Sequence, residues 1–329
     1  MKALRWKLPA MFLVMAATAS AQPASTGPST ELRTGSGQAY PAKHVRIITA
    51  AAGGGSDFAT RLIATPLGSA LGQQVIVDNR GLLAADIAAK SPPDGHTLLL
   101  SGQTLWLLPF MRDNVATDEK DFTPVTLATS TANILVVHPA LPVKSSKELV
   151  ALARARPGQL NYATSGVGNS VHLAGELFRA MSGLDVVRVN YKAASQALTD
   201  LIAGQTQFMF AVPGSSVPHV RAGRLRALAT TSAKPSPLAP ELPTVSQAVP
   251  GFEMATRLAI FAPAGTPAPI VIRLSQEIAK VLARPDLKEK FLASSIEPVS
   301  STPEELGALV KSEIARMGRI IKLAGIRAD

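Results

Sequence analysis

The chain has 329 residues, enough for two domains that each bury a core of their own. Its 47% hydrophobic and 17% charged residues exclude an intrinsically disordered chain, and the lack of cysteine excludes disulfides, thiol nucleophiles, cysteine-ligated metals and a lipid-modified cysteine. Of the net charge of +10, Lys2, Arg5 and Lys7 contribute +3, and the remaining +7 is spread without basic blocks. Aromatic residues make up only 5%, so we expect no nucleic-acid binding.

Residues 1–21 have the pattern of a cleavable signal peptide. A basic start from Lys2 to Lys7 precedes an apolar stretch over residues 8–17, and Ala19-Ser20-Ala21 gives the small-x-small site, so we expect cleavage after Ala21. The apolar stretch is shorter than the ~20 residues that span a bilayer. Residues 22–39 are rich in Ser, Thr, Gly and Pro and predict a flexible linker. We therefore expect export to the periplasm.

The first part of the folded region alternates strands and helices. Short β-branched or apolar runs predict strands at 45–49, 75–77 and 97–100, and apolar spacing predicts a helix over 57–71. Strands that alternate with helices favour a mostly parallel sheet.

The same alternation continues through the rest of the chain. Strands are predicted at 134–137, 160–163, 186–189, 208–212, 226–230 and 260–263. Helices are predicted at 145–155, 169–181, 194–203, 215–222, 267–282, 285–293 and 303–324. The sequence thus predicts two α/β units, each a mostly parallel sheet flanked by helices.

Two Gly-rich loops each end a predicted strand and begin a predicted helix. The candidate ligand-binding residues in them are Gly53, Gly54, Gly55, Ser56 and Asp57 in the first loop and Ser165, Gly166, Gly168, Asn169 and Ser170 in the second. Helix N-termini present free N–H groups that suit a carboxylate or phosphate, and glycine lets a ligand approach the backbone. The alternative is a pair of capped structural turns, and Asp57 fits a capping role better than contact with an anion.

Catalytic and metal motifs are missing from the sequence. There is no G-x-S-x-G elbow and no Walker A loop, and Gly166-x-Gly168 is followed by Val171 where a dinucleotide fingerprint needs glycine. The five histidines are scattered without metal-binding spacing, and we expect His172 at a helix surface or between lobes. We predict no enzyme activity, cofactor or metal; an exported hydrolase that uses Ser170 and His172 is the remote alternative.

A series of short motifs along the chain resembles one family of receptors, the Bug (Bordetella uptake gene) family of tripartite tricarboxylate transporters. The resemblance covers Tyr40 to the C-terminus. The motifs are Tyr40-Pro41-Ala42-Lys43, Gly53-Gly54-Gly55-Ser56-Asp57, Asp78-Asn79-Arg80, Pro93-Asp94-Gly95-His96-Thr97-Leu98, Lys120-Asp121-Phe122-Thr123-Pro124-Val125, Arg156-Pro157-Gly158-Gln159-Leu160-Asn161-Tyr162-Ala163, His172-Leu173-Ala174-Gly175-Glu176-Leu177-Phe178, Tyr191-Lys192, Ala222-Gly223-Arg224-Leu225-Arg226-Ala227-Leu228-Ala229 and Phe261-Ala262-Pro263-Ala264-Gly265-Thr266-Pro267.

This resemblance implies a two-lobed type 2 periplasmic-binding-protein fold that closes on its ligand. Lobe one would comprise 40–133 plus 262–329 and lobe two 138–256, with hinges near 134–137 and 257–261. It also implies that the two Gly-rich loops grip the carboxylates of a ligand, and Thr104 and Ala211 complete the predicted site.

The chain departs from the family pattern at three places. Ala50-Ala51-Ala52 replaces an aromatic and proline pair, Gly81 to Ala85 is a shortened Gly-rich stretch, and Ala211 stands where an aspartate that suits an amino group is common. We therefore expect a carboxylate ligand without an amine, and a roomier site. Trp106 either fills part of that space or packs in the core instead.

The resemblance implies a monomeric periplasmic receptor that passes a small organic anion to the membrane permease subunits of a transporter. The alternative is a receptor of the same fold that signals to a two-component sensor kinase.

Overall fold

The computed structural model describes residues 40–113, 115–165, 169–323 and 325–327. The predicted signal peptide (1–21) and linker (22–39) lie outside these residues. Within the described ranges, no helix has the length and apolar character needed to cross a membrane.

The first sheet has five strands in the order β2-β1-β3-β10-β4. These are β2 (Val75–Asn79), β1 (Val45–Thr49), β3 (Thr97–Gly102), β10 (Ala255–Pro263) and β4 (Phe122–Ala132). β1 runs parallel to both of its neighbours, and β10 runs antiparallel to both of its own. Parallel neighbours bring the carboxyl ends of β1, β2 and β3 to one edge, where ligands bind in open α/β sheets.

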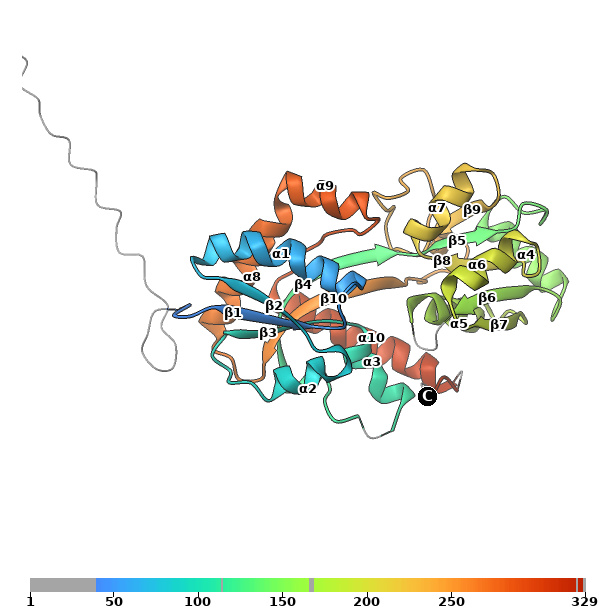
Figure 1. The fold of residues 1–329 in the computed structure, drawn as a ribbon. Coiled ribbons are helices and arrows are strands. Elements are labelled where there is room, and N and C mark those ends of the chain that lie inside the picture. The colour runs from blue at the N-terminus through green and yellow to red at the C-terminus, as the bar shows by residue number, and fades with distance from the viewer. Residues whose placement is uncertain (1–39, 114, 166–168, 324, 328–329) are drawn as a thin grey trace, which may run out of the picture. The chain divides into compact units, whose positions relative to one another are not determined.

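Helices cover both faces of the first sheet (Figure 1). Val45 and Ile47 contact the apolar faces of one group of helices, and the alternate residue Ile48 belongs to the core on the opposite face, as the two-residue period of a strand requires. The first face carries α1 (Gly55–Leu71), α8 (Ala268–Ala283) and α9 (Pro285–Ala293), and the second carries α2 (Ala84–Ala89), α3 (Thr104–Met111) and α10 (Pro303–Leu323).

The second sheet also has five strands, in the order β7-β6-β8-β5-β9, with its antiparallel strand in the same fourth place. Its strands are β7 (Val187–Tyr191), β6 (Asn161–Ser165), β8 (Phe208–Ala211), β5 (Ile134–Val137) and β9 (Arg226–Thr230). Again three strands are parallel and the fourth, β5, is antiparallel to both neighbours. One face packs on α4 (Ser146–Ala155) and α5 (Ser170–Ser182), and the other on α6 (Ala194–Ile202) and α7 (Pro213–Arg221). The predicted fold, two mostly parallel sheets flanked by helices, is confirmed.

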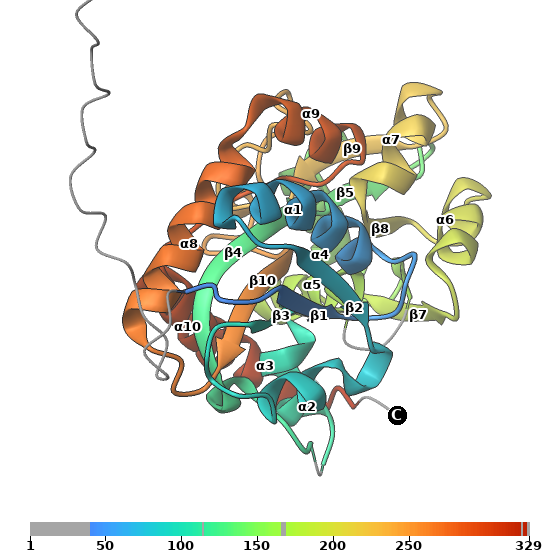
Figure 2. The ribbon, with the colours of Figure 1, turned by 60° about the vertical axis from the view of Figure 1, so that its left-hand side comes forward.

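The chain passes between the sheets twice, from β4 through Asn133 to β5 and from β9 through 231–254 to β10. Thr231 joins the two passages, because its N–H donates to the Asn133 carbonyl at 2.9 Å and its carbonyl accepts from the N–H of Met254 at 2.8 Å. In the first sheet β4 and β10 lie side by side (Figure 2). Strand pairing places 134–137 inside the second sheet and 257–261 inside the first; the hinges and lobe boundaries stay a prediction.

Candidate ligand-binding site

A cavity of about 390 Å³ lies between residues of the two sheets. It is lined by the N-termini of α1 and α7, by β4 and β10, and by the segment that follows α9. Its residues are Gly55, Ser56, Thr129, Thr131, Val212, Pro213, Gly214, Thr256, Leu258, Ser294, Ser295 and Ile296.

The first predicted loop reaches this cavity at the start of α1. Gly54 caps the helix in an extended conformation, and Gly55 and Ser56, the first two helical residues, line the cavity. The first N–H groups of a helix have no acceptor within it and carry its partial positive charge. This edge of the cavity therefore suits a carboxylate.

Asp57 holds the loop and is not among the described residues that line the cavity. Its carboxylate accepts from the N–H of Gly53 at 2.9 Å and from Asn79 Nδ2 at 3.0 Å, and it pairs with Arg61 at 2.9 Å. The hydrogen bond from Gly53, with the contribution of Arg61, holds the pKa of the Asp57 carboxyl below its ordinary value. The carboxylate is thus ionised and satisfied within the loop.

The second predicted loop approaches the cavity through Ser170. Asn169 caps α5, since its side chain accepts from the N–H of His172 at 2.9 Å. The Ser170 hydroxyl accepts from the hydroxyl of Thr256, a cavity-lining residue, at 2.7 Å. Ser165 is buried at the end of β6. Gly166 and Gly168 lie outside the described residues.

The other predicted residues stand apart from the described lining. Ala211 is fully buried in the core at the end of β8, and the next residue, Val212, lines the cavity instead. Thr104 is exposed as the first residue of α3 and is not among the described lining residues. Trp106 is fully buried, and its Nε1 donates to Glu313 Oε2 at 2.9 Å, so its role is core packing.

Sequence reasoning missed three parts of the site. One is the start of α7 at Pro213 and Gly214, which Pro213 signals as a first helical residue. Another is Ser294 to Ile296 after α9, which no sequence signal marks because its place in the cavity depends on tertiary packing. The third is formed by strand residues of β4 and β10, namely Thr129, Thr131, Thr256 and Leu258.

The described lining is neutral. It combines hydroxyl groups with apolar side chains, and none of its members is an acid, a base or a histidine. Over the same described ranges, no group of three or more His, Asp or Glu side chains is placed to hold a metal ion. Backbone N–H groups and hydroxyls are thus the polar groups that the described lining offers to a ligand.

The buried carboxylate of Glu176, on α5, is bound by three side chains. Glu176 accepts from Tyr162 at 2.6 Å, from Arg179 at 2.8 Å and from Arg188 at 3.1 Å. Burial alone would raise the pKa of Glu176, but the hydrogen bond from Tyr162 and the two guanidinium groups outweigh it and lower that pKa. Glu176 is therefore ionised.

His172 belongs to the same network. The expectation that it lies at a helix surface or between lobes is wrong, because its side chain is only 1% exposed among Glu176 and Arg188. Its Nε2 lies 2.8 Å from Arg188 Nη1, and since a guanidinium only donates, this nitrogen accepts. The Ser170 hydroxyl contacts Thr256 and His172 Nε2 contacts Arg188, so these contacts do not form a nucleophile–base pair.

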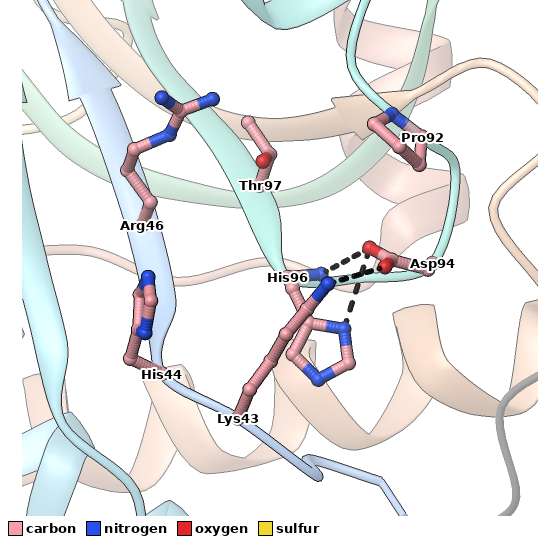
Figure 3. Close-up of a pocket in the computed structure, with 7 residues that line it drawn as sticks. All are labelled: Lys43, His44, Arg46, Pro92, Asp94, His96 and Thr97. Atoms are coloured by element: carbon pink, nitrogen blue, oxygen red, sulfur yellow. Dashed lines mark hydrogen bonds and ion pairs between the residues drawn. The ribbon is translucent and has the colours of Figure 1, made fainter. Parts of the chain in front are cut away.

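A second cavity, of about 240 Å³, lies at the starts of β1 and β3 (Figure 3). Lys43, His44, Arg46, Pro92, Asp94, His96 and Thr97 line it. The Asp94 carboxylate points toward Lys43 and His96, and its oxygens lie 3.3 Å from Lys43 Nζ and from His96 Nδ1 (Figure 3). Asp94, the one carboxylate among the described lining residues, is therefore already paired with Lys43. The turn of the Pro93-Asp94-Gly95-His96 motif thus has a structural role, at the sheet edge opposite to the N-terminus of α1.

The family model of the tripartite tricarboxylate transporter receptors matches residues 59–326. The chain belongs to this family. It is 36% identical over 291 residues to the UPF0065 protein of the tcbD-tcbE intergenic region of Pseudomonas sp. strain P51, covering 86% of this chain and 87% of that protein. It is 32% identical over 304 residues to the protein BugT of Bordetella pertussis, covering 89% and 92%.

One solved structure is similar to this chain in both sequence and fold. The structure of Rpa4515 from R. palustris with adipate is 34% identical to this chain, with a TM-score of 0.68, over 88% of this chain and all of that one. The predicted membership of the Bug family is thus confirmed, and the chain is a receptor of the tripartite tricarboxylate transporter family.

Proposed function

We propose that this receptor captures a small carboxylate without an amino group in the cavity between its two sheets. One observation carries the proposal: the α1 N-terminus opens into a cavity whose described lining is neutral and rich in hydroxyls. A carboxylate there accepts charge-assisted hydrogen bonds from Gly55 and Ser56, and the helix dipole favours its charge. The adipate in the structure of the relative Rpa4515 supports this class of ligand.

The same lining disfavours an ammonium group on the ligand. A buried ammonium needs a carboxylate or several acceptors, and none of the described lining residues is acidic. Asp57, the acid nearest in sequence, is already bound by Gly53, Asn79 and Arg61. Ala211 is buried in the core beside the cavity-lining Val212 and adds no acidic group to the described lining.

We propose that the receptor works in the periplasm as a monomer and delivers the acid to the permease subunits of a tripartite tricarboxylate transporter. The family model supports this role. Export would use the predicted signal peptide over 1–21. Binding requires no chemical step: two lobes close, exclude water and strengthen the polar contacts of the bound acid.

Matched acid and amino-acid pairs test this function. We would titrate the purified protein calorimetrically with succinate and aspartate, glutarate and glutamate, and adipate and 2-aminoadipate. The amine-free member of at least one pair should bind, and its partner should bind at least about tenfold more weakly, because an unpaired buried polar group costs roughly 1–3 kcal/mol. Tight binding of the amino acids would overturn the proposed selectivity, and no binding of any acid would overturn the function.

A further inference from the structure

We infer that Ser295 and Gly214, which face one another across the edge of the cavity, set the size of the acid that this receptor accepts. This inference rests on the proposed function, because it assigns a specificity-determining role within the same cavity. Ser295 follows α9 at the first sheet, and Gly214 is the second residue of α7 at the second sheet. Neither residue was marked by the sequence motifs.

The backbone of Ser295 is held in an unusual conformation. Its φ of 56° makes it the one non-glycine with a positive φ among the residues that the structure describes. Such conformations persist where the surrounding structure imposes them, and they cluster at functional sites. Here the N–H of Ser295 donates to the Leu292 carbonyl at 2.9 Å, and the N–H of Ile296 donates to the Phe291 carbonyl at 3.0 Å.

The segment after Ser295 is bound to the first sheet. The carbonyl of Glu297 accepts from the N–H of Ser130 at 3.0 Å, and its own N–H donates to the Thr131 hydroxyl at 3.1 Å. Pro298 forms a bridge with Thr129. Ser295 is therefore held between the end of α9 and the edge of β4, so it cannot easily withdraw from a ligand.

Gly214 meets Ser295 closely. A Cβ placed on Gly214 would lie 3.6 Å from both Cβ and Oγ of Ser295, which is ordinary van der Waals contact. The Ser295 side chain thus fills the space that a larger residue at position 214 would need. The contact between these two residues joins the part of the cavity wall after α9 to the part at the start of α7.

The other residues of the cavity wall explain why the contact between Ser295 and Gly214 affects the size of the acid that binds and not its charge. Val212, Leu258 and Ile296 present apolar surface, and Thr129 and Thr131 present hydroxyls that stay in place with their strands. One methylene of misfit in such a wall changes affinity by roughly 10–200-fold. Removing the Ser295 side chain should therefore make room for a longer acid, and filling the same space from position 214 should remove that room.

Compensating variants test the inference. For the wild type, Ser295→Gly, Gly214→Ser and the double variant, we would measure dissociation constants for the straight dicarboxylates from four to eight carbons, adipate included. Ser295→Gly should change the ratio of the constants for adjacent acids about tenfold in favour of the longer acid. Gly214→Ser in that background should restore the wild-type ratio, because a Cβ at position 214 lies 3.6 Å from the Ser295 side chain and the serine hydroxyl extends beyond it into the vacated space.

Ser300→Gly is the matched control, since Ser300 is exposed in the same segment and is not among the described lining residues. It should leave every ratio unchanged. Folding of Ser295→Gly is not in question, because glycine adopts a positive φ without strain. An unchanged ratio in Ser295→Gly, or no reversal in the double variant, would overturn this inference and leave the proposed function intact. If the wild type binds none of the acids, the proposed function and this inference are both overturned.

Discussion

Asp57 shows how an acid can border the proposed anion site with its own charge balanced. Its two oxygens are occupied by Gly53 and Asn79, and Arg61 neutralises its charge. The neighbouring Gly55 and Ser56, whose N–H groups have no acceptor within the helix, line the cavity. The sequence allowed the capping role of Asp57 to be predicted, because an acid in the first turn of a helix has a local partner whatever the tertiary fold.

His172 makes stability depend on pH. Burial and the neighbouring Arg188 guanidinium lower its pKa in the folded protein, against the opposite influence of Glu176. As the pH falls below the ordinary histidine value of about 6.5, the unfolded chain takes up a proton that the folded chain resists. The free energy of unfolding should therefore decrease from pH 7 downward until the pH reaches the lowered pKa.

Urea denaturation of the wild type and His172→Gln between pH 7.5 and 5 measures this contribution. The glutamine oxygen can still accept from Arg188, but it does not titrate, so the variant should lose less stability over this range. Other titrating groups, such as the buried His96, are common to both proteins and cancel in the difference. Parallel pH profiles would contradict a neutral, proton-resistant His172.

Residue-level prediction failed where a position depends on distant parts of the chain. Ser295 and Ile296 reach the cavity only because β4 holds the segment that follows them. Conversely, Ala211 was predicted in the site from a family position, and the side chain lies in the core while Val212 turns to the cavity.

At the scale of elements, segments with strong local periodicity were predicted from the sequence, whereas a strand that depends on long-range pairing was not. The helix over 57–71 was found to within two residues, as α1 begins at Gly55. β4 was missed, because Pro124 and a run of threonines and alanines lack the alternation of a half-buried strand. Only pairing with β10 along its length makes this segment a strand.

The turn before β3 depends on one glycine. Gly95 has a φ of +81°, and a Cβ there would lie 2.4 Å from Ile270 Cγ2 and 2.8 Å from the ring of Tyr40. Gly95→Ala should therefore destabilise the protein both through the backbone and through a clash. Gly265→Ala is its matched control, because Gly265 has a φ of +82° with nothing within 4 Å.

Denaturant titration should show that Gly95→Ala costs about 1–3 kcal/mol more than Gly265→Ala, which is the range for overpacking a filled core. Affinity for acids should stay unchanged in both, since neither residue is among the described lining of the ligand cavity. Equal losses of stability in the two variants would show that the contact between Gly95, Ile270 and Tyr40 is not tight.

At the scale of the whole molecule, the two sheets share one arrangement, with an antiparallel strand in fourth place, and helix N-termini line a shared cavity. The alternation of strands and helices and the family motifs allowed this architecture to be predicted. The exact crossing between the sheets was not predictable, because Asn133, Thr231 and Met254 meet only in the folded chain.

The central claim is that a carboxylate binds at the start of α1, between the sheets. A crystal structure with the tightest-binding acid of the series tests it most directly. We predict a carboxylate oxygen within hydrogen-bond distance of the N–H groups of Gly55 and Ser56, with the body of the acid against Leu258 and Ile296. An acid bound instead in the second cavity, beside Lys43 and Arg46, would contradict the account.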